Sequence, residues 1–454
     1  MIAPRTALLL WTAFVLVPMA GWLTVAPGPV PVLIILAGVC AVVWDAVRSR
    51  EALAYMNTIV PGTVRLARQR SDRIVIRLAG KSDQAGTIRV GCAFPEELGV
   101  RHDIRTVHLR PGQREGRVEW NVYPLERGRY RLDACHLETP SRWRFWNVRR
   151  TVPVALDILV YPGLLSERRR VPALFMRRGF VGIQHQRRFG KGREFEQLRD
   201  YQPGDSLEDI HWKATAKRGH PVTKMFQIER TQEVYVAIDA SRLSGRRIAS
   251  KRVDAEHEAE DAYATEPLVE RYVNSALLLG RAAEMQGDLF GLITFSDRLL
   301  SFVRARRGHG HYRACLDAVC RLQPQPVAPD FGEVCSFIRH QLRRRALIIV
   351  LTQLDDPVLA ESVVRDLELI RRQHLVAVCM PAPPLIRPLF SEAQDVDRPE
   401  DLYAALGGHL RWRRLREISD ALQKKGIGFL LTPDDSMLAS LVTHYLNIKQ
   451  RQML

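Results

Sequence analysis

The chain has 454 residues, a length that exceeds what one hydrophobic core usually serves and therefore predicts several domains. Hydrophobic residues make up 46% and charged residues 26%, which are the proportions of a folded globular protein and exclude a mainly disordered chain. The formal net charge of +17 indicates an acidic partner, for which nucleic acid and anionic lipid headgroups are the two candidates.

Residues 1–50 predict a hairpin of two transmembrane helices. Residues 6–25 and 30–47 form two apolar runs, and the Pro- and Gly-containing residues 26–29 break the helix between them. A helix of about 20 residues rises roughly 30 Å, which is the thickness of the hydrocarbon layer. Asp45 stands near the end of the second run, where an acid can reach the interface. A cleaved signal peptide is the alternative for the first run, although the second run would still anchor the protein.

The flanking charges predict the orientation of this hairpin. The turn between the two runs has no Lys or Arg, whereas Arg5 precedes the first run and Arg48 and Arg50 follow the second. By the positive-inside rule, both termini and the main domains then lie in the cytoplasm. An adjacent anionic leaflet accounts for the positive charge, at roughly 1 kcal/mol for each nearby Lys or Arg. The sequence has no zinc-finger spacing, basic zipper or aromatic RNA-binding motif, so we expect a membrane and no nucleic acid as partner.

The seven cysteines are scattered along the chain and include no C-x-x-C pair. An odd number with this spacing excludes a disulfide framework and a structural zinc site. Such usage is typical of the reducing cytoplasm and agrees with the orientation predicted from the arginines.

Residues 51–163 are predicted to form a β-sandwich-like domain. Alternating apolar and polar residues mark short strands at residues 73–78, 87–90, 106–109 and 117–122. Turn residues separate them at intervals of roughly 8–15 residues, which is typical of a sandwich or barrel.

Residues 164–230 combine a basic connector with a segment of unusual composition. Residues 164–193 hold many Arg and Lys residues against the single acid Glu167. Such a run is either a solvated tether or a contact for lipid or an acidic partner. Residues 194–217, called here the signature segment, then interleave charged, aromatic and turn residues.

The signature segment contains the residues that we expect to bind a partner. Its charged residues are predicted to form a network around two aromatic rings, with Lys213 on the same helix: Glu194, Arg199, Asp200, Tyr201, Asp205, Trp212 and Lys213. Asp205 predicts an N-cap that opens this helix. The network either holds the segment on the next domain or presents a docking surface for another protein. No nucleophile with an adjacent base and no P-loop is evident, so we expect no catalysis.

Residues 231–454 are predicted to form a doubly wound open α/β sheet. Strands apolar on both faces are expected at residues 234–239, 289–295, 346–351, 375–380 and 428–431, with an edge strand at 299–303. Helical patterns alternate with them at residues 268–285, 312–322, 331–344, 357–373, 415–425 and 436–449. Alternation of this kind is typical of an open sheet with helices on both faces.

The signature segment resembles that of the bacterial family catalogued as domain of unknown function 58. The likeness is carried by residues 192–205 and by residues 210–217, Ile-His-Trp-Lys-Ala-Thr-Ala-Lys. Members of that family are usually anchored in the inner membrane and carry a von Willebrand factor A-like domain. The resemblance therefore implies such a domain over residues 231–454 and a membrane-bound protein.

Asp239 and Ser241 resemble the first loop of the von Willebrand A-type metal site, whose pattern is D-x-S-x-S. Oxygen ligands of this kind suit Mg²⁺. Leu243 replaces the second serine, and Gln353 stands where the family places an aspartate. We therefore expect no cofactor and regard this as a degenerate metal site. In the alternative interpretation, Asp239 caps a loop or a helix.

The resemblance also implies a function, because members of the family are commonly encoded near a MoxR-type AAA+ ATPase and are presumed to work with it. We expect a membrane-anchored scaffold that helps such an ATPase to assemble or mature a client complex. An envelope-associated hydrolase is the alternative, with Glu194, Asp200 and Asp205 as its carboxylates. A metal-dependent adhesion module is a third interpretation, against which Leu243 and Gln353 count.

Overall fold

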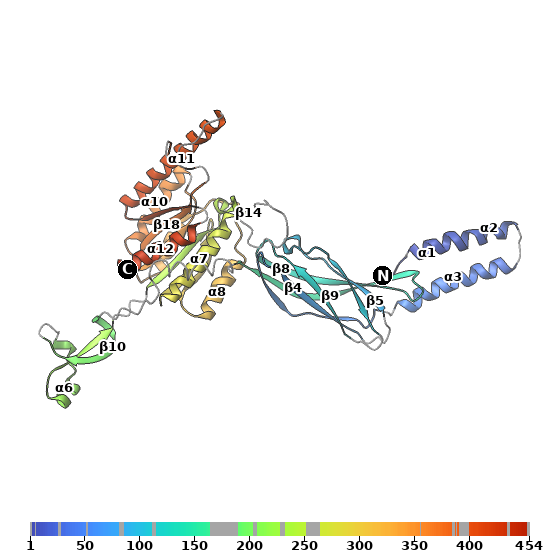
Figure 1. Cartoon of the computed structure of the whole chain (residues 1–454), viewed down its shortest axis with the longest axis horizontal. Helices are drawn as coiled ribbons and strands as arrows, with labels where there is room; N and C mark the ends of the chain where they lie inside the picture. The colour runs from blue at the N-terminus through green and yellow to red at the C-terminus, as the bar shows by residue number, and fades with distance from the viewer. Residues whose placement is uncertain are drawn as a thin grey trace. The chain divides into compact units, whose positions relative to one another are not determined.

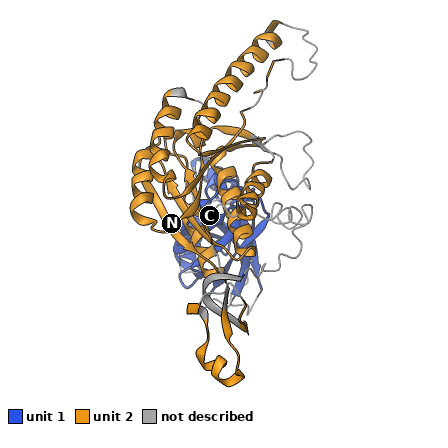
Figure 2. Ribbon diagram, turned by 90° about the vertical axis from the view of Figure 1, so that its left-hand side faces the viewer, with its two compact units in different colours: residues 1–163, 253–259 blue, residues 164–252, 260–454 orange. Residues whose placement is uncertain are grey.

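A computed structural model of the chain divides into two compact units, residues 1–163 with 253–259 and residues 164–252 with 260–454 (Figures 1 and 2). The structure describes residues 2–4, 6–25, 29–50, 53–80, 86–110, 115–163, 189–202, 207–227, 232–250, 264–354, 356–383, 386, 388–389, 399–433 and 436–451. Most of the predicted basic connector therefore lies outside the described residues, as do Asp205 and Asp355.

The first unit begins with two helical segments. The first comprises α1 (Thr6–Trp11), a π-helical turn η1 (Thr12–Leu16) and α2 (Val17–Val25). The π-helical turn ends two residues before Pro18, whose ring and missing N–H disturb the regular ladder of hydrogen bonds. The second is α3 (Pro29–Ser49), in which residues 32–49 are long and apolar enough to cross a membrane, with a mean hydropathy of 2.0.

The described part of the first unit contains nine strands. They are β1 (Ile2–Pro4), β2 (Asn57–Ile59), β3 (Thr63–Ala67), β4 (Asp72–Ala79), β5 (Gly86–Cys92), β6 (Ile104–Leu109), β7 (Glu115–Val122), β8 (Gly128–Pro140) and β9 (Trp146–Tyr161). One sheet has the order β1-β9-β8-β5-β6, with β3 also on β9, and the other has the order β2-β4-β7. Ile76 and Trp120 from the smaller sheet share one buried core with Leu137 and Ile158 from the larger. The four strands predicted from alternation appear as β4, β5, β6 and β7.

Asp45 lies against the β8–β9 turn instead of standing alone at the end of an apolar helix. Its side chain is 4% exposed and accepts a hydrogen bond from Ser141 Oγ at 2.5 Å. Strand β1, which precedes both helical segments, also pairs with β9, through residues 2–4 and 146–148. The sequence pattern could not show the contact between Asp45 and Ser141, because these residues are 96 positions apart.

The second unit is built on a six-stranded sheet of order β16-β15-β12-β17-β18-β19. Its strands are β12 (Glu233–Asp239), β15 (Leu289–Phe295), β16 (Leu299–Arg306), β17 (Ala346–Leu351), β18 (Leu375–Pro381) and β19 (Gly428–Thr432). All neighbours are parallel except the edge pair β15–β16. The predicted central strands and the edge strand are therefore confirmed in place and in direction.

Helices cover both faces of this sheet. The helices are α7 (Leu268–Met285), α8 (His309–Cys320), α9 (Phe331–Gln341), α10 (Pro357–Arg371), α11 (Pro399–Lys424) and α12 (Met437–Gln450). Alternate residues of β12 face opposite cores: Val236 packs with α7, α8 and α12, and Tyr235 packs with α9, α10 and α11. Helix α11 begins 16 residues before the predicted start at residue 415.

The signature segment forms a separate two-stranded sheet. Strand β10 (Phe189–Asp200) pairs antiparallel with β11 (Val222–Gln227), and η3 (Leu207–Asp209) and α6 (Trp212–Arg218) lie between them in sequence. A second small hairpin joins β13 (Arg247–Ser250) to β14 (Ala264–Pro267) after the 3-10 turn η4 (Arg242–Gly245). These hairpins were not predicted, because their strands lack a regular alternation of apolar residues.

Candidate functional site

Asp239 ends the central strand β12, at the carboxyl edge where open parallel sheets bind ligands. Its side chain is fully buried. One carboxylate oxygen accepts a hydrogen bond from Ser241 N at 2.8 Å, and the other accepts from Thr352 Oγ1 at 2.6 Å. The carboxylate therefore ties the end of β12 to the loop after β17.

The neighbouring strand ends supply further buried polar groups. Ser296, directly after β15, has its Oγ 2.7 Å from Asp297 Oδ1 and 2.9 Å from Gln325 Oε1. Gln353 is 5% exposed, and its Oε1 has no hydrogen-bond partner among the residues that the structure describes. Buried polar groups from several strand ends thus gather around Asp239 at this edge of the sheet.

The residues around Asp239 do not fit a divalent cation. Both oxygens of Asp239 already accept protein hydrogen bonds, and Ser241 Oγ accepts from Leu243 N at 3.3 Å. Within the described ranges, no group of three or more His, Cys, Asp or Glu side chains could hold a metal ion. A cage for Mg²⁺ normally needs more than one carboxylate or a bound phosphate. The geometry agrees with the interpretation of Asp239 as a loop-capping residue.

The structure places the predicted partner-binding residues on the β10–β11 hairpin and on α6. Glu194 lies in β10, where its backbone pairs with Gln227, and its side chain is outside the described part. Arg199 Nη1 donates to Gln202 Oε1 at 2.5 Å. Asp200 is 72% exposed and pairs with His220 at 2.9 Å. The network around Tyr201 and Trp212 stays a prediction, because Asp205 and the side chain of Glu194 lie outside the described part.

Helix α6 presents the aromatic residue of the segment to solvent. Trp212 opens the helix and is 70% exposed, Lys213 beside it is exposed, and Tyr201 is half-buried at the end of β10. The cap of α6 is His211, whose Nδ1 accepts from Ala214 N at 3.0 Å, and not the predicted Asp205. The helix is shorter than expected because the 3-10 turn η3 occupies the residues before it.

Residues 197–383 match the family described as Protein of unknown function DUF58. This DUF58 region runs from the signature segment to the end of β18. The uncharacterized proteins Rv1480 of Mycobacterium tuberculosis and Mb1516 of Mycobacterium bovis are each 24% identical over 191 residues, which is 41% of this chain and 54% of each relative. The chain thus spans about half the length of the curated relatives that it matches.

Two solved structures show a more distant likeness. Proximal thread matrix protein 1 from the mussel byssus is 10% identical, with a TM-score of 0.25 over 48% of this chain and 46% of its own. The PapD-like domain 7 of human CEP192 is 8% identical, with a TM-score of 0.18 over 24% of this chain and 87% of its own. Neither is similar enough to identify a fold.

A second exposed apolar surface lies beyond the DUF58 region, on the first half of α11. Its large side chains are exposed at 45% for Leu402, 72% for Tyr403, 41% for Leu406 and 55% for Leu410. Residues four apart share one face of a helix, so the three leucines form a stripe with Tyr403 beside it. This surface was not predicted, although the leucines recur at helical spacing.

Asp239→Asn is expected to raise the melting temperature near neutral pH. Burial raises the pKa of Asp239 above its ordinary value of 3.8, against the opposing hydrogen bonds from Thr352 and Ser241. A carboxyl with a raised folded-state pKa favours folding below its unfolded pKa, and this contribution is lost as the pH rises through the folded-state pKa. The amide keeps the shape without the charge, so we expect a gain of about 1 kcal/mol, or roughly 2–4 °C.

Thermal unfolding of both proteins in detergent from pH 4 to 8 checks this prediction, with and without Mg²⁺. The advantage of the variant should grow as the pH rises. A variant less stable than the parent at pH 7, together with a Mg²⁺-dependent gain in the parent alone, would show that the charged carboxylate holds a cation.

Proposed function

We propose that the protein is a membrane-anchored scaffold whose α/β unit acts as a von Willebrand A-like protein-binding module. Its expected partners are a MoxR-type AAA+ ATPase and a client protein. Residues 1–50 would form a transmembrane hairpin in a bacterial inner membrane, with both termini and the main domains in the cytoplasm. The proposal rests on the resemblance of the signature segment and on the surfaces described above.

The apolar helices support the membrane anchor. Only 11% of the window at residues 32–49 is buried inside the protein, unlike the core helix of a soluble domain. Leu33, Leu36 and Phe14 are each at least 60% exposed. Trp11 packs closely against α3, since a Cβ on Gly38 would lie 2.5 Å from its ring. Close packing at a glycine is a common contact between membrane helices.

The observation that carries the proposed binding function is the exposure of Trp212 and Leu207 at 70% and 69%. Burying a large apolar side chain contributes about 1.5–3 kcal/mol, so leaving two of them in water on one short segment is costly for an isolated protein. Tryptophan is also among the residues most enriched at the centres of protein interfaces. We therefore assign docking, and not internal packing, to this segment.

The charges beside Trp212 indicate the character of the partner surface. Lys213, Lys217 and Arg218 are exposed on the same short helix, and the exposed acid Asp200 is paired with His220. Complementary charge at the rim of an interface guides association and excludes unsuitable partners. The ATPase surface that receives α6 is therefore expected to be acidic around an apolar pocket.

Trp212→Ala is expected to weaken capture of the AAA+ ATPase by roughly tenfold or more, the size of effect typical of an aromatic anchor. The test is a pull-down of the full chain from detergent-solubilised membranes, with and without ATP, followed by identification of the retained ATPase. Val358→Ala is the matched control, because Val358 is 78% exposed in the same unit but outside the signature segment.

Both variants should melt like the parent, because both side chains are exposed. Equal recovery of the ATPase by parent and a folded Trp212→Ala variant would contradict docking through α6. Recovery of no ATPase by the parent itself would contradict the proposed partner.

The hydrolase alternative gains no support from the described residues. It requires Glu194, Asp200 and Asp205 to line one pocket, yet Asp200 is 72% exposed and paired with His220. A general acid is usually partly buried beside a second carboxylate.

A further inference from the structure

We propose that the β8–β9 turn, residues 141–146, is a second membrane-contact site that takes anionic phospholipid headgroups beside the apolar helices. This inference rests on the proposed membrane anchoring. It adds a lipid-binding element within the β-sheet part of the first unit, which the helical anchor alone would not require.

The turn is fixed to the last turns of α3 by three hydrogen bonds. Ser141 Oγ donates to one oxygen of Asp45 at 2.5 Å, and Trp143 N donates to the other at 3.3 Å. Trp146 Nε1 donates to the backbone oxygen of Val42 at 3.1 Å. Since Asp45 and Ser141 are each 4% exposed, these bonds belong to a buried joint.

The turn also contacts the first helical segment. Phe145 packs edge-on against Trp11 of α1, with ring centroids 6.1 Å apart. Trp11 in turn lies against Gly38 of α3. The turn therefore contacts both helices and is held at a defined level along them.

That level corresponds to the membrane interface. With a rise of 1.5 Å per residue, Val42 and Asp45 lie roughly 6–10 Å before the end of α3 at Ser49. The headgroup region extends a similar distance of roughly 5–8 Å beyond the hydrocarbon on each side. If the hydrocarbon layer ends near Val42, so that residues 43–49 pass through the headgroup region, the β8–β9 turn is at the depth of the headgroups.

The side chains at the tip suit this position. Trp143 is 51% exposed and lies between the exposed Arg142 and Arg144. Neither arginine has a carboxylate partner among the residues described by the structure. Tryptophan prefers the boundary between headgroups and acyl chains, and arginine binds phosphate oxygens through several N–H groups. Anionic headgroups would satisfy both residue types at once.

The backbone of the turn holds these side chains outward. Arg144 has a φ of 62°, in the left-handed region, and its N–H donates to Ser141 O at 3.0 Å. A left-handed conformation costs a non-glycine residue about 1–2 kcal/mol. The joint to Asp45 and the strand pairs below the turn stabilise this conformation.

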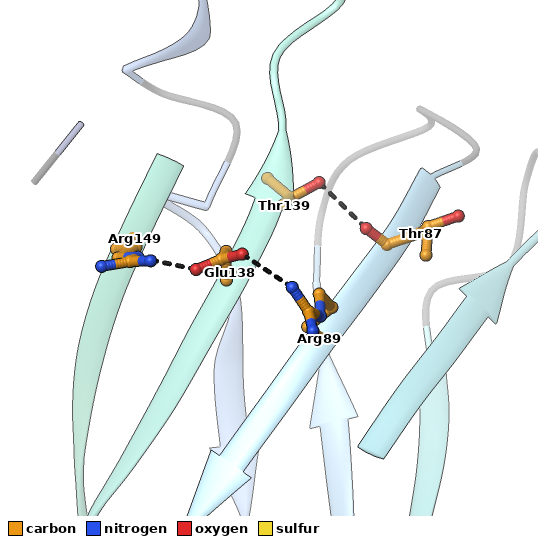
Figure 3. A network of polar contacts seen from close by, with 5 residues as sticks. All are labelled: Thr87, Arg89, Glu138, Thr139 and Arg149. Atoms are coloured by element: carbon orange, nitrogen blue, oxygen red, sulfur yellow. Dashed lines mark hydrogen bonds and ion pairs between the residues drawn. The ribbon is translucent and has the colours of Figure 1, made fainter. Parts of the chain in front are cut away.

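A polar network makes the base of the turn rigid (Figure 3). Glu138 on β8 pairs with Arg149 on β9 at 2.6 Å and with Arg89 on β5 at 3.4 Å. Thr139 Oγ1 donates to the backbone oxygen of Thr87 at 3.2 Å. Three strands are thereby joined directly below the residues that reach the interface.

Tryptophan quenching tests the depth of the turn in the full chain. The protein is placed in nanodiscs of phosphatidylglycerol and phosphatidylcholine that carry bromine near the upper end of one acyl chain. The difference between the parent and Trp143→Phe gives the fluorescence of Trp143, which the bromine is expected to quench. The difference between the parent and Trp212→Phe gives the fluorescence of Trp212, which the bromine is expected to leave unchanged. Trp212 is a matched control because it is also exposed but belongs to the other unit.

Native mass spectrometry tests the headgroup preference. In the double variant Arg142→Gln/Arg144→Gln, the ratio of bound phosphatidylglycerol to bound phosphatidylcholine is expected to fall roughly tenfold. This size follows from the usual contribution of a basic residue near an anionic surface. The control is Arg343→Gln/Arg344→Gln, which removes two exposed charges from the other unit.

The outcomes separate this inference from the membrane anchor. Quenching of the helical tryptophans without quenching of Trp143, or an unchanged lipid preference, overturns the lipid site and leaves the anchor intact. Failure of the parent to enter nanodiscs, or absence of any quenching, overturns the anchor and the lipid site together. Because Trp143→Phe changes an exposed residue, its melting temperature should equal that of the parent.

Discussion

Asp288→Ala is expected to lower the free energy of unfolding of the α/β unit by about 3–5 kcal/mol, as for a buried ion pair that loses one partner. Asp288 is 2% exposed at the start of β15. It accepts hydrogen bonds from Lys449 Nζ at 2.7 Å, from the hydroxyl of Tyr445 and from Gln232 N at 3.2 Å. These contacts fix α12 to the sheet, so that helix should lose protection first.

Denaturant titration of the full chain in detergent gives the loss of stability, and hydrogen exchange of α12 gives its location. Asp288→Asn is the graded control, since an amide retains one acceptor oxygen, for either Gln232 N or the Tyr445 hydroxyl, and does not neutralise Lys449. We expect the free energy of unfolding to decrease from the parent to the Asn variant and from the Asn variant to the Ala variant. Equal protection of α12 in parent and Ala variant would falsify the assigned anchoring role.

Asp45→Ala is expected to release the β8–β9 turn from α3, at a cost of about 1–3 kcal/mol for each buried donor left without an acceptor. Ser141 Oγ and Trp143 N both lose their partner in this variant. Hydrogen exchange of residues 141–150 in nanodiscs should therefore accelerate, with little change in the six-stranded α/β sheet.

Two variants serve as controls for the role of Asp45. Asp45→Asn keeps one acceptor for Trp143 N and an amide beside Ser141 Oγ, so most of the protection should remain. Asp72→Ala removes an exposed acid from β4 of the same unit and should leave the turn unchanged. Equal rates of hydrogen exchange at residues 141–150 in Asp45→Ala and Asp72→Ala would show that the hydrogen bonds of Asp45 do not hold the turn.

The central sheet of the second unit could be predicted because its strands are buried on both faces. Residues 234–239 and 346–351 are almost wholly apolar, a pattern that fits a parallel strand under two layers of helices. Asp239 could likewise be placed at a strand end from the sequence. Its hydrogen bond with Thr352 could not be predicted, because the two residues are 113 positions apart in the sequence.

Other parts escaped prediction for physical reasons. The first half of α11 buries little of its surface. Its leucines recur at helical spacing but face no core, and the helix was predicted to begin only at residue 415. Strand β10 carries several charges and, among the described strands, pairs with β11 alone, so it lacks the sequence pattern of a half-buried strand. The burial of Asp45 depends on a turn distant in sequence, which no local pattern reports.

The length of strand β9 determines how far the chain travels within the first unit. It runs for 16 residues from Trp146 to Tyr161, a contour of roughly 50 Å at about 3.3 Å per residue. One end adjoins the turn fixed to α3, and the other leads to the exit of the first unit at residue 163. Long ladders with β8 and β3 stiffen it. Within the first unit, the chain is therefore carried roughly 50 Å along one stiff strand, from the turn beside α3 to residue 163.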